Sequence, residues 1–474
     1  MLYLSIDRNK PIPMIRQLYT ELRTKILQRE WKGGDKLPST RKLAEELCVS
    51  RNVVVEAYEQ LLAEGMLETR PGSGYFVVEG IYLEQHARRL GGDKTALHPE
   101  EKSPTPHDGL IDFRSGVPSA AHFPRKHWGK IAQQVCLEAP SSAFLYNQPE
   151  GRNELRQSLS RYLYRTRGVQ CAPEQIIITS GATQALVLIA KAMLNRESVV
   201  LLEDPITNDI QTIFVTFGAS LYPVPVDKDG ILTDRLPSLD EVRPNLLFVT
   251  PSHQFPLGGT LPIQRRIALI QYARQAGCYI VEDDYDNEFR YDTPPISSLQ
   301  GLDTDRVIYV GSFSKILSPA LRLGYLVLPP ELVHRFRREK WFSDLHTPAL
   351  EQLTLSQFME YGHLEKYVNR MKKLYKKRRQ HVCDTLNQTF GDRVRIWGAS
   401  AGLHIVAAFE GVRFTDELLE KAEAFGVRLY PVEAHAIEKG RHEDKVIIGY
   451  GNLTEADITE GIRRLQSFFH HALG

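Results

Sequence analysis

The stretch that decides the fold of the larger part of the chain is Ser312-Phe-Ser-Lys-Ile-Leu-Ser-Pro-Ala-Leu-Arg322. It follows Val307-Ile-Tyr-Val310, a short apolar run that predicts a buried strand. Lys315 therefore comes soon after a strand, between two serines and ahead of an arginine. A lysine amine in such a place can form an imine with an aldehyde. For this stretch alone, a surface loop with ordinary charges is the alternative.

The same stretch carries groups that suit a phosphate. The hydroxyls of Ser312 and Ser314 and the guanidinium of Arg322 could hold one, because arginine binds phosphate in a bidentate way. Pyridoxal 5'-phosphate (PLP) is an aldehyde that carries a phosphate. The stretch therefore predicts a PLP site with Lys315 as its reactive amine.

The composition is that of a soluble globular protein. The chain has 474 residues, enough for roughly three domains, or fewer if one is a large α/β unit. Hydrophobic residues make up 42%, charged residues 25% and the net charge is +1, so nucleic-acid binding would need a local basic patch. The five cysteines lack zinc-ligand spacing, and neither a signal peptide nor an apolar run of about 18 residues occurs. We expect reduced thiols, no membrane contact and a cytoplasmic location.

The first 80 residues carry a helix-turn-helix pattern. Apolar residues at helical spacing predict a first helix over 14–30. Ser39 or Thr40 caps a short second helix, and Ser50 caps a third. Two short strands joined by a glycine-rich turn then predict a wing over 66–78. By spacing alone, a small helical cap on a larger domain fits as well.

The start of the third helix is the expected DNA contact. In a helix-turn-helix, the amino end of the second of the two helices enters the major groove, which here is Ser50-Arg51-Asn52. Arg51 can reach a guanine edge, and Asn52 an adenine edge or a phosphate.

The run Lys36-Leu-Pro-Ser-Thr-Arg-Lys-Leu-Ala-Glu-Glu-Leu-Cys-Val-Ser-Arg-Asn52, with 57–65 and 72–77, resembles the winged helix of GntR-family regulators. The resemblance implies a domain over residues 1–80 that binds double-stranded DNA. The residues it offers for that contact are Ser39, Arg41, Ser50, Arg51, Asn52, Gly72 and Gly74. Residues 81–109 are polar, rich in Pro and Gly and without a period, which predicts a linker.

Strands and helices alternate from Ile111 onward, which predicts an α/β fold with a mostly parallel sheet. The strand 176–179 is followed by Ser180-Gly-Ala-Thr-Gln184 and an apolar helix over 185–194. Small residues before a helix predict an anion site, because the backbone N–H groups and the helix dipole favour negative charge there. Many such turns bind nothing, so this site is weak evidence alone.

The segment Tyr279-Ile-Val-Glu-Asp-Asp-Tyr285 is the stronger sign. A strand delivers an acidic pair at its end, and a tyrosine follows. A buried carboxylate can keep the pyridine nitrogen of PLP protonated, and a tyrosine hydroxyl can bond its phenolic oxygen. An acidic turn that caps the next helix is the alternative for this segment taken alone.

Together these segments resemble a fold-type I PLP-dependent transferase of the class I aminotransferase kind. The resemblance implies an effector domain over 110–474, a large α/β sandwich with a small C-terminal α+β subdomain within 340–474. It makes Lys315 the Schiff-base lysine, Asp283 the partner of the pyridine nitrogen and Tyr285 that of the phenolic oxygen. The implied phosphate-lining residues are Ser180, Gly181, Ala182, Ser312, Ser314 and Arg322.

The same resemblance implies a homodimer, because Tyr146 matches the tyrosine that reaches the phosphate in the partner subunit. A winged helix joined through a linker to this domain resembles the MocR-type transcription regulators. The match spans essentially the whole chain.

Four positions depart from the pattern of these relatives. Phe255 stands where aminotransferases place an asparagine, Thr207 where an aromatic ring stacks on the pyridine, and Asp209 where related regulators have an arginine. Asn452 replaces the arginine that grips a carboxylate, a loss of roughly 1.5–3 kcal/mol. We expect PLP to bind and a ligand held by its carboxylate to be disfavoured. Another residue, such as Arg428 or His404, could grip the ligand, or either could be structural.

The sequence thus predicts a PLP-dependent, sequence-specific DNA-binding transcription regulator. Its effector would be an amine, an amino acid or PLP itself. A working aminotransferase with an appended DNA-binding domain is the alternative, favoured by the intact Lys315, Asp283 and Tyr285. A third hypothesis, a DNA-binding protein with a dead cofactor domain, predicts no visible absorbance. The sequence names neither the operator, nor the effector, nor the direction of regulation.

Overall fold

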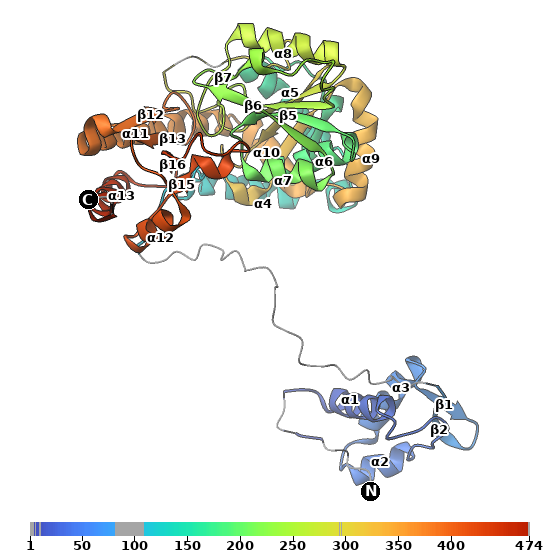
Figure 1. The fold of residues 1–474 in the computed structure, drawn as a ribbon. Coiled ribbons are helices and arrows are strands. Elements are labelled where there is room, and N and C mark those ends of the chain that lie inside the picture. Colours follow the sequence, from blue (N-terminus) through green and yellow to red (C-terminus); the bar gives the residue numbers. More distant parts are fainter. Residues whose placement is uncertain are drawn as a thin grey trace. The chain divides into compact units, whose positions relative to one another are not determined.

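The computed structural model describes residues 4, 6–8, 11–80, 109–292, 294 and 296–472 (Figure 1). The chain divides into two compact units, Met1–Ser103 and Pro104–Gly474. Of the predicted linker over 81–109, all but residue 109 lies outside the described residues. The described part holds no helix with the length and apolar character needed to cross a membrane.

The N-terminal unit is a three-helix core with a two-stranded wing. Its helices pack through buried apolar side chains at helical spacing, among them Leu22, Val54 and Tyr58. The strands are antiparallel, with Leu67 opposite Val77. The elements are α1 (Met14–Leu27), α2 (Thr40–Glu46), α3 (Arg51–Ala63), β1 (Leu67–Arg70) and β2 (Gly74–Val77).

The first helix is shorter than predicted. It ends at Leu27 rather than near residue 30, because Arg29 adopts a left-handed backbone conformation with φ of 62°. The predicted cap of α2 is in place, because the Ser39 hydroxyl accepts from the Lys42 N–H at 3.2 Å, whereas Ser50 precedes α3 without a side-chain capping bond.

The C-terminal unit is built on an eight-stranded sheet in the order β4-β11-β10-β9-β8-β5-β6-β7. The strands from β10 to β6 in this order run parallel, whereas β11 and β7 are antiparallel to their neighbours. The strands are β4 (Ile176–Thr179), β5 (Val199–Asp204), β6 (Ser220–Asp227), β7 (Gly230–Ile231), β8 (Leu246–Val249), β9 (Tyr279–Asp284), β10 (Val307–Ser312) and β11 (Gly324–Val327).

Both faces of this sheet are covered by helices (Figure 1). Since side chains alternate along a strand, Leu202 and Phe248 pack in the core with α6 and α7, whereas Leu201 and Leu247 pack in the core with α8. The helices of this part are α4 (Arg125–Glu138), α5 (Asn153–Arg167), α6 (Ala182–Met193), α7 (Asn208–Thr216), α8 (Ile263–Ala276), α9 (Val333–Asp344) and α10 (Ala349–Glu360).

The helix predicted from residue 185 begins three residues earlier. Gly181 takes the position before the first turn with φ of 84°, so Ala182 is already helical. The small residues predicted as an anion site therefore include the first turn of α6 itself.

The C-terminal part of this unit carries a second sheet, in the order β12-β13-β16-β15. A separate two-stranded pair joins Val427 in β14 to Ile111 in β3, so the beginning of the unit packs against this part. The elements are β3 (Ile111–Asp112), α11 (His363–Phe390), β12 (Val394–Trp397), β13 (His404–Phe409), α12 (Asp416–Ala424), β14 (Val427–Arg428), β15 (Tyr430–Pro431), β16 (Lys445–Gly449) and α13 (Glu455–Ala472).

Candidate cofactor and DNA-binding sites

The carboxyl ends of four neighbouring parallel strands, β10, β9, β8 and β5, meet at one edge of the large sheet. The segments that follow these strands carry the residues singled out in the sequence. Lys315 follows β10, Asp283 lies at the end of β9, Phe255 follows β8 and Thr207 follows β5. Such an edge is where open α/β sheets bind ligands.

Lys315 is partly buried. Burial lowers its pKa, while the carboxylates of Asp286 and Asp283 act in the opposite direction. The backbone of Gly116 lies against it: a Cβ on this residue would lie 2.6 Å from Nζ of Lys315. Only glycine fits there, because Gly116 also has φ of 67°. The sequence did not point to Gly116, whose contact with Lys315 is made entirely in the fold.

Asp283 is a buried carboxyl group with an unused oxygen. Its Oδ1 has no hydrogen-bond partner in the described part of the chain. Burial, with a smaller contribution from Asp284, raises its pKa to about 7. A buried, unpaired carboxyl oxygen fits a ring nitrogen that carries a proton, because a charged partner would offset the free-energy cost of burying the carboxylate. The donor set at this edge therefore fits a pyridine ring.

The predicted phosphate residues come together in space. Nη2 of Arg322 donates to the carbonyl oxygen of Ser180 at 2.7 Å. The hydroxyls of Ser312 and Ser314 lie 2.9 Å apart. Gly181 lies under the same guanidinium, because a Cβ on it would come within 2.8 Å of Arg322 Nη2. The first turn of α6, with Ala182, completes an arrangement of N–H, hydroxyl and guanidinium groups suited to a phosphate.

Tyr285 is held by a buried group that sequence reasoning missed. Its hydroxyl donates to the carbonyl oxygen of His253 at 2.9 Å and lies 3.2 Å from Nδ1 of the same residue. Asp286 in turn lies 3.0 Å from that Nδ1. The stretches 250–258 and 282–289 contain these residues, but their type alone does not reveal that a histidine after β8 meets an aspartate after β9.

Phe255 lies between this group and a loop of the C-terminal part. Its ring centroid is 6.3 Å from that of Tyr285, 5.4 Å from that of His404 and 5.3 Å from that of His435. Phe255, at the position where aminotransferases have a hydrogen-bonding asparagine, therefore makes aromatic contacts instead. Of Phe255 and Tyr285, only Tyr285 offers a hydroxyl group to a ligand.

Tyr146 is not joined to these residues within its own chain. Its side chain is 82% exposed, and its ring lies 6.4 Å from that of His346. Its reach to a partner subunit stays a prediction.

Two candidate ligand-gripping residues are engaged elsewhere. Arg428 pairs with Glu423 and lies 3.8 Å from Asp112, which connects α12 to β3. His404 is buried and donates from Nε2 to the carbonyl oxygen of Pro256 at 3.0 Å. Burial lowers the pKa of His404 to about 4, so it is neutral at physiological pH. Asn452 uses its side-chain oxygen to accept from the Ala120 N–H at 3.1 Å.

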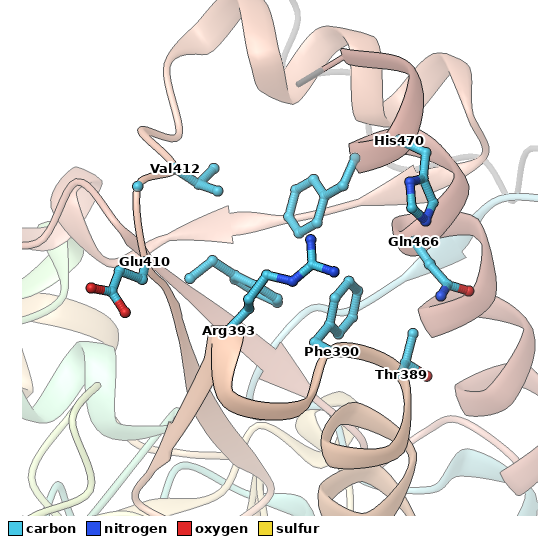
Figure 2. A pocket seen from close by; sticks show the side chains of 10 residues that line it. Thr389, Phe390, Arg393, Glu410, Val412, Gln466 and His470 are labelled. Atoms are coloured by element: carbon cyan, nitrogen blue, oxygen red, sulfur yellow. The ribbon is translucent and has the colours of Figure 1, made fainter. Parts of the chain in front are cut away.

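A hollow of about 370 Å³ lies elsewhere, between α11, the turn from β13 and α13. Phe390, Phe409 and Phe469 wall it, and Figure 2 shows the guanidinium of Arg393 beside the ring of Phe390. The polar side chains around it, such as Arg393 and His470, are exposed. This hollow therefore lacks a buried charged group like the Asp283 carboxyl at the edge of the large sheet.

The seven residues expected to contact DNA are all exposed on the N-terminal unit: Ser39, Arg41, Ser50, Arg51, Asn52, Gly72 and Gly74. A shallow hollow between α2 and the start of α3 is lined by Arg41, Cys48 and Arg51, among others. Nε of the exposed Arg51 guanidinium donates a long hydrogen bond of 3.4 Å to Oγ1 of Thr40, which orients the guanidinium on this surface. Gly72 and Gly74 have φ of 69° and 103° in the tip of the wing.

Fold and sites together define a winged helix-turn-helix unit joined to an aminotransferase-like unit. The bacterial regulatory GntR family model matches residues 14–77, and the aminotransferase class I and II model matches residues 108–465. The chain belongs to the class I and II aminotransferase family over that larger part.

More closely, the chain belongs to the MocR-type HTH transcriptional regulators. It is 36% identical to the HTH-type transcriptional regulator YdeL of Bacillus subtilis (strain 168), over 98% of both chains. It is 33% identical to the probable rhizopine catabolism regulatory protein MocR of Rhizobium meliloti, over 98% of this chain and 96% of the relative. Among solved structures, Thermus thermophilus LysN, an α-aminoadipate aminotransferase complexed with N-(5'-phosphopyridoxyl)-L-leucine, is similar with a TM-score of 0.70, 30% identity and coverage of 77% and 93%.

Proposed function

We propose that this transcription regulator binds PLP at Lys315 and senses an amine or amino acid there, and that the winged helix carries the response to operator DNA. The observation that supports it most is the unpaired, buried Oδ1 of Asp283 at the same sheet edge as the partly buried Lys315. The family and the PLP-derived ligand of the LysN structure support PLP as the cofactor. We also propose a cytoplasmic location, where such a regulator meets its DNA.

Each residue of the site has a defined task in this proposal. PLP supplies an electrophilic carbonyl and an electron-withdrawing ring when bound. Lys315 offers an amine whose lowered pKa favours the neutral, nucleophilic form. Asp283 would keep the proton on the ring nitrogen, and the Tyr285 hydroxyl would turn from the His253 carbonyl to the phenolic oxygen. Arg322, with the serines and the first turn of α6, holds the phosphate.

Sensing depends on what the lysine does when a ligand arrives. If an amine took the place of Lys315 on the cofactor, the freed lysine side chain would take up a proton, which the carboxylates of Asp286 and Asp283 favour. For this local change to regulate DNA binding, the ligand must bind one arrangement of the protein better than another.

We also propose a homodimer. Tyr146 lies in a run of exposed apolar side chains, with Phe144 57% exposed and Leu145 68% exposed, and Phe342 of α9 is 71% exposed. Large exposed apolar side chains of this kind are typical of surfaces that another subunit covers. Two subunits would present two winged helices to paired half-sites.

An aminotransferase that turns over remains the second candidate, because Lys315, Asp283 and Tyr285 are in place. The neutral Asn452, engaged with the Ala120 N–H, argues against the grip on a carboxylate that transamination of amino acids uses.

The test is an absorbance titration of the purified full-length protein with PLP, followed by candidate amines. We expect a visible band that the Lys315→Ala variant lacks and the Lys191→Ala control retains. DNA selected from a random library should then bind with an affinity that an active amine changes. Release of a keto acid or aldehyde during the titration would favour the aminotransferase. A protein without any band after PLP is added would exclude the cofactor proposal.

A further inference from the structure

Helix α11 carries a stripe of positive charge on its exposed side. Between Lys366 and Cys383 the sequence has eight lysines and arginines and neither aspartate nor glutamate, although the whole chain has a net charge of only +1. At intervals of four, three and four residues, which keep side chains on one side of a helix, stand the exposed Lys366, Arg370, Lys373 and Lys377. The stripe is about 16 Å long, at 1.5 Å per residue.

The amino end of α4 extends this stripe. The ring centroids of His127 in α4 and His363 at the start of α11 lie 4.6 Å apart. Nη2 of Arg370 donates to the carbonyl oxygen of His122, shortly before α4, at 2.9 Å. The first turn of α4 therefore lies beside the first turns of α11. The exposed residues of the combined surface, which we call the basic face, are Lys126, Lys130, Lys366, Arg370, Lys373 and Lys377.

The charges of the basic face are largely unneutralised. Within the part of the chain that the structure describes, only Lys377 of this set forms an ion pair, at 2.8 Å from Glu455. Glu365, the nearest acid in α11, is paired with Arg165 instead. The first turn of α4 contains no acidic residue, although the helix dipole favours negative charge there. A bound polyanion would neutralise this local excess of positive charge.

We infer that the basic face is a second DNA-binding surface, which contacts the phosphate backbone beside the site that the winged helix reads. The chain carries a GntR-type DNA-binding unit, so DNA is a polyanion that it meets. Positive charges that recur along a helix suit the repeated charges of a phosphate backbone, and such contacts hold DNA without reading its sequence. Another subunit fits this surface less well, because lysine is depleted in subunit interfaces. The inference does not depend on the cofactor.

The experiment measures binding of the full-length protein to a DNA site selected from a random library. The minimal site is compared with the same site extended on both sides by unrelated sequence, at several salt concentrations. The test variant replaces three unpaired charges of the basic face together: Lys126→Gln, Lys366→Gln and Lys373→Gln. The control variant removes three exposed charges from the segment between β6 and β8, which packs with α8: Lys228→Gln, Arg235→Gln and Arg243→Gln.

We expect the wild type to bind the extended DNA more tightly than the minimal site and with a steeper salt dependence. The test variant should bind the extended DNA at least about tenfold more weakly, with a slope of log K against log salt reduced by about 2 to 3, and should bind the minimal site like the wild type. The control variant should retain the gain from the extension. Hydroxyl-radical footprints should show backbone protection beyond the minimal site for the wild type and not for the test variant.

Three results would overturn the inference. The wild type might gain no affinity from the extension, the test variant might keep the whole gain and its salt slope, or the control variant might lose as much as the test variant. The first two results would leave the basic face to an acidic protein partner, and the third would show an effect of overall charge. None of them changes binding of the minimal site, so recognition of DNA by the winged helix is tested separately.

Discussion

The carboxylate of Asp286 lies 3.0 Å from Nδ1 of His253, and both side chains are almost completely buried. This pair fixes the imidazole beside the cofactor site, and the backbone carbonyl of His253 accepts the hydroxyl of Tyr285. Gly402 closes the other side, because a Cβ on it would lie 2.2 Å from the His253 ring. The position of the Tyr285 hydroxyl therefore depends on His253, which Asp286 holds in turn.

Replacing Asp286 by asparagine should destabilise the protein. The change removes the charge from a buried hydrogen bond, which is worth roughly 1.5–3 kcal/mol, and chemical denaturation of the apoprotein would measure the lowered free energy of unfolding. Tyr285→Phe is the control, because it loses one hydrogen bond of an uncharged hydroxyl, about 1 kcal/mol. If the two substitutions lowered the free energy of unfolding equally, the charge of Asp286 would add nothing to stability beyond an ordinary hydrogen bond.

The buried carboxyl of Asp283 predicts a pH dependence of the apoprotein. Burial raises its pKa from 3.8 to about 7, so between these values the unfolded chain ionises while the folded protein keeps the proton. The folded protein then binds more protons than the unfolded chain, and stability contributed by this residue is lost as pH rises from about 4 to about 7. Above that range the loss is complete and constant.

Asp283→Asn removes this ionisation. We expect the apoprotein variant to gain roughly 1–3 kcal/mol over the wild type at pH 8 and much less at pH 4, measured by denaturation at each pH. The same variant should bind PLP more weakly, because asparagine cannot supply a negative charge to the ring nitrogen. Asp392→Asn, on the surface, should change neither quantity. A variant that is no more stable than the wild type at pH 8 would contradict the raised pKa.

The sequence predicted the chemistry of the site better than its support. Lys315, Asp283 and Arg322 stand in short linear patterns at or after the ends of β9 and β10, and their roles at the cofactor stay predictions. Gly116 was missed, since its contact with the amine of Lys315 joins the beginning of the C-terminal unit to β10. The strand order was equally inaccessible, because pairing depends on which apolar faces pack together and not on any one strand. The helices of the first unit followed from helical spacing and caps, with an error of a few residues at the end of α1, whereas the winged helix itself rested on the resemblance to GntR-family regulators.

The glycine at the start of α6 should be essential for phosphate binding. Gly181 has φ of 84°, and a Cβ on it would lie 2.8 Å from Nη2 of Arg322. Gly181→Ala should therefore displace the guanidinium, weaken PLP binding at least about tenfold and cost about 1 kcal/mol or more of stability. Spectroscopic titration with PLP and denaturation of the apoprotein would measure the two effects.

The chain supplies a matched control for this substitution. Gly129 lies within α4, where a Cβ would meet nothing within 4 Å. Gly129→Ala should stabilise the protein slightly, by up to about 1 kcal/mol, because alanine favours a helix. If both alanine variants bound PLP like the wild type, the close contact of Gly181 with Arg322 would not matter for the cofactor.

Arg51 provides the sharpest test of the DNA-binding surface, because it is the first residue of α3 and its guanidinium stands in solvent beside Thr40. Arg51→Ala should weaken binding to a selected DNA site by roughly 1–3 kcal/mol and relax the preference at one base pair, as expected of a guanine contact.

Arg23→Ala is the matched control: Arg23 lies 3.5 Å from Glu64, at the opposite end of α3. Both variants remove one positive charge, so a loss that depends only on charge would appear in both. A loss confined to Arg51→Ala, with the base preference changed, assigns the amino end of α3 to the major groove, whereas equal losses with unchanged preference would leave Arg51 as a phosphate contact at most.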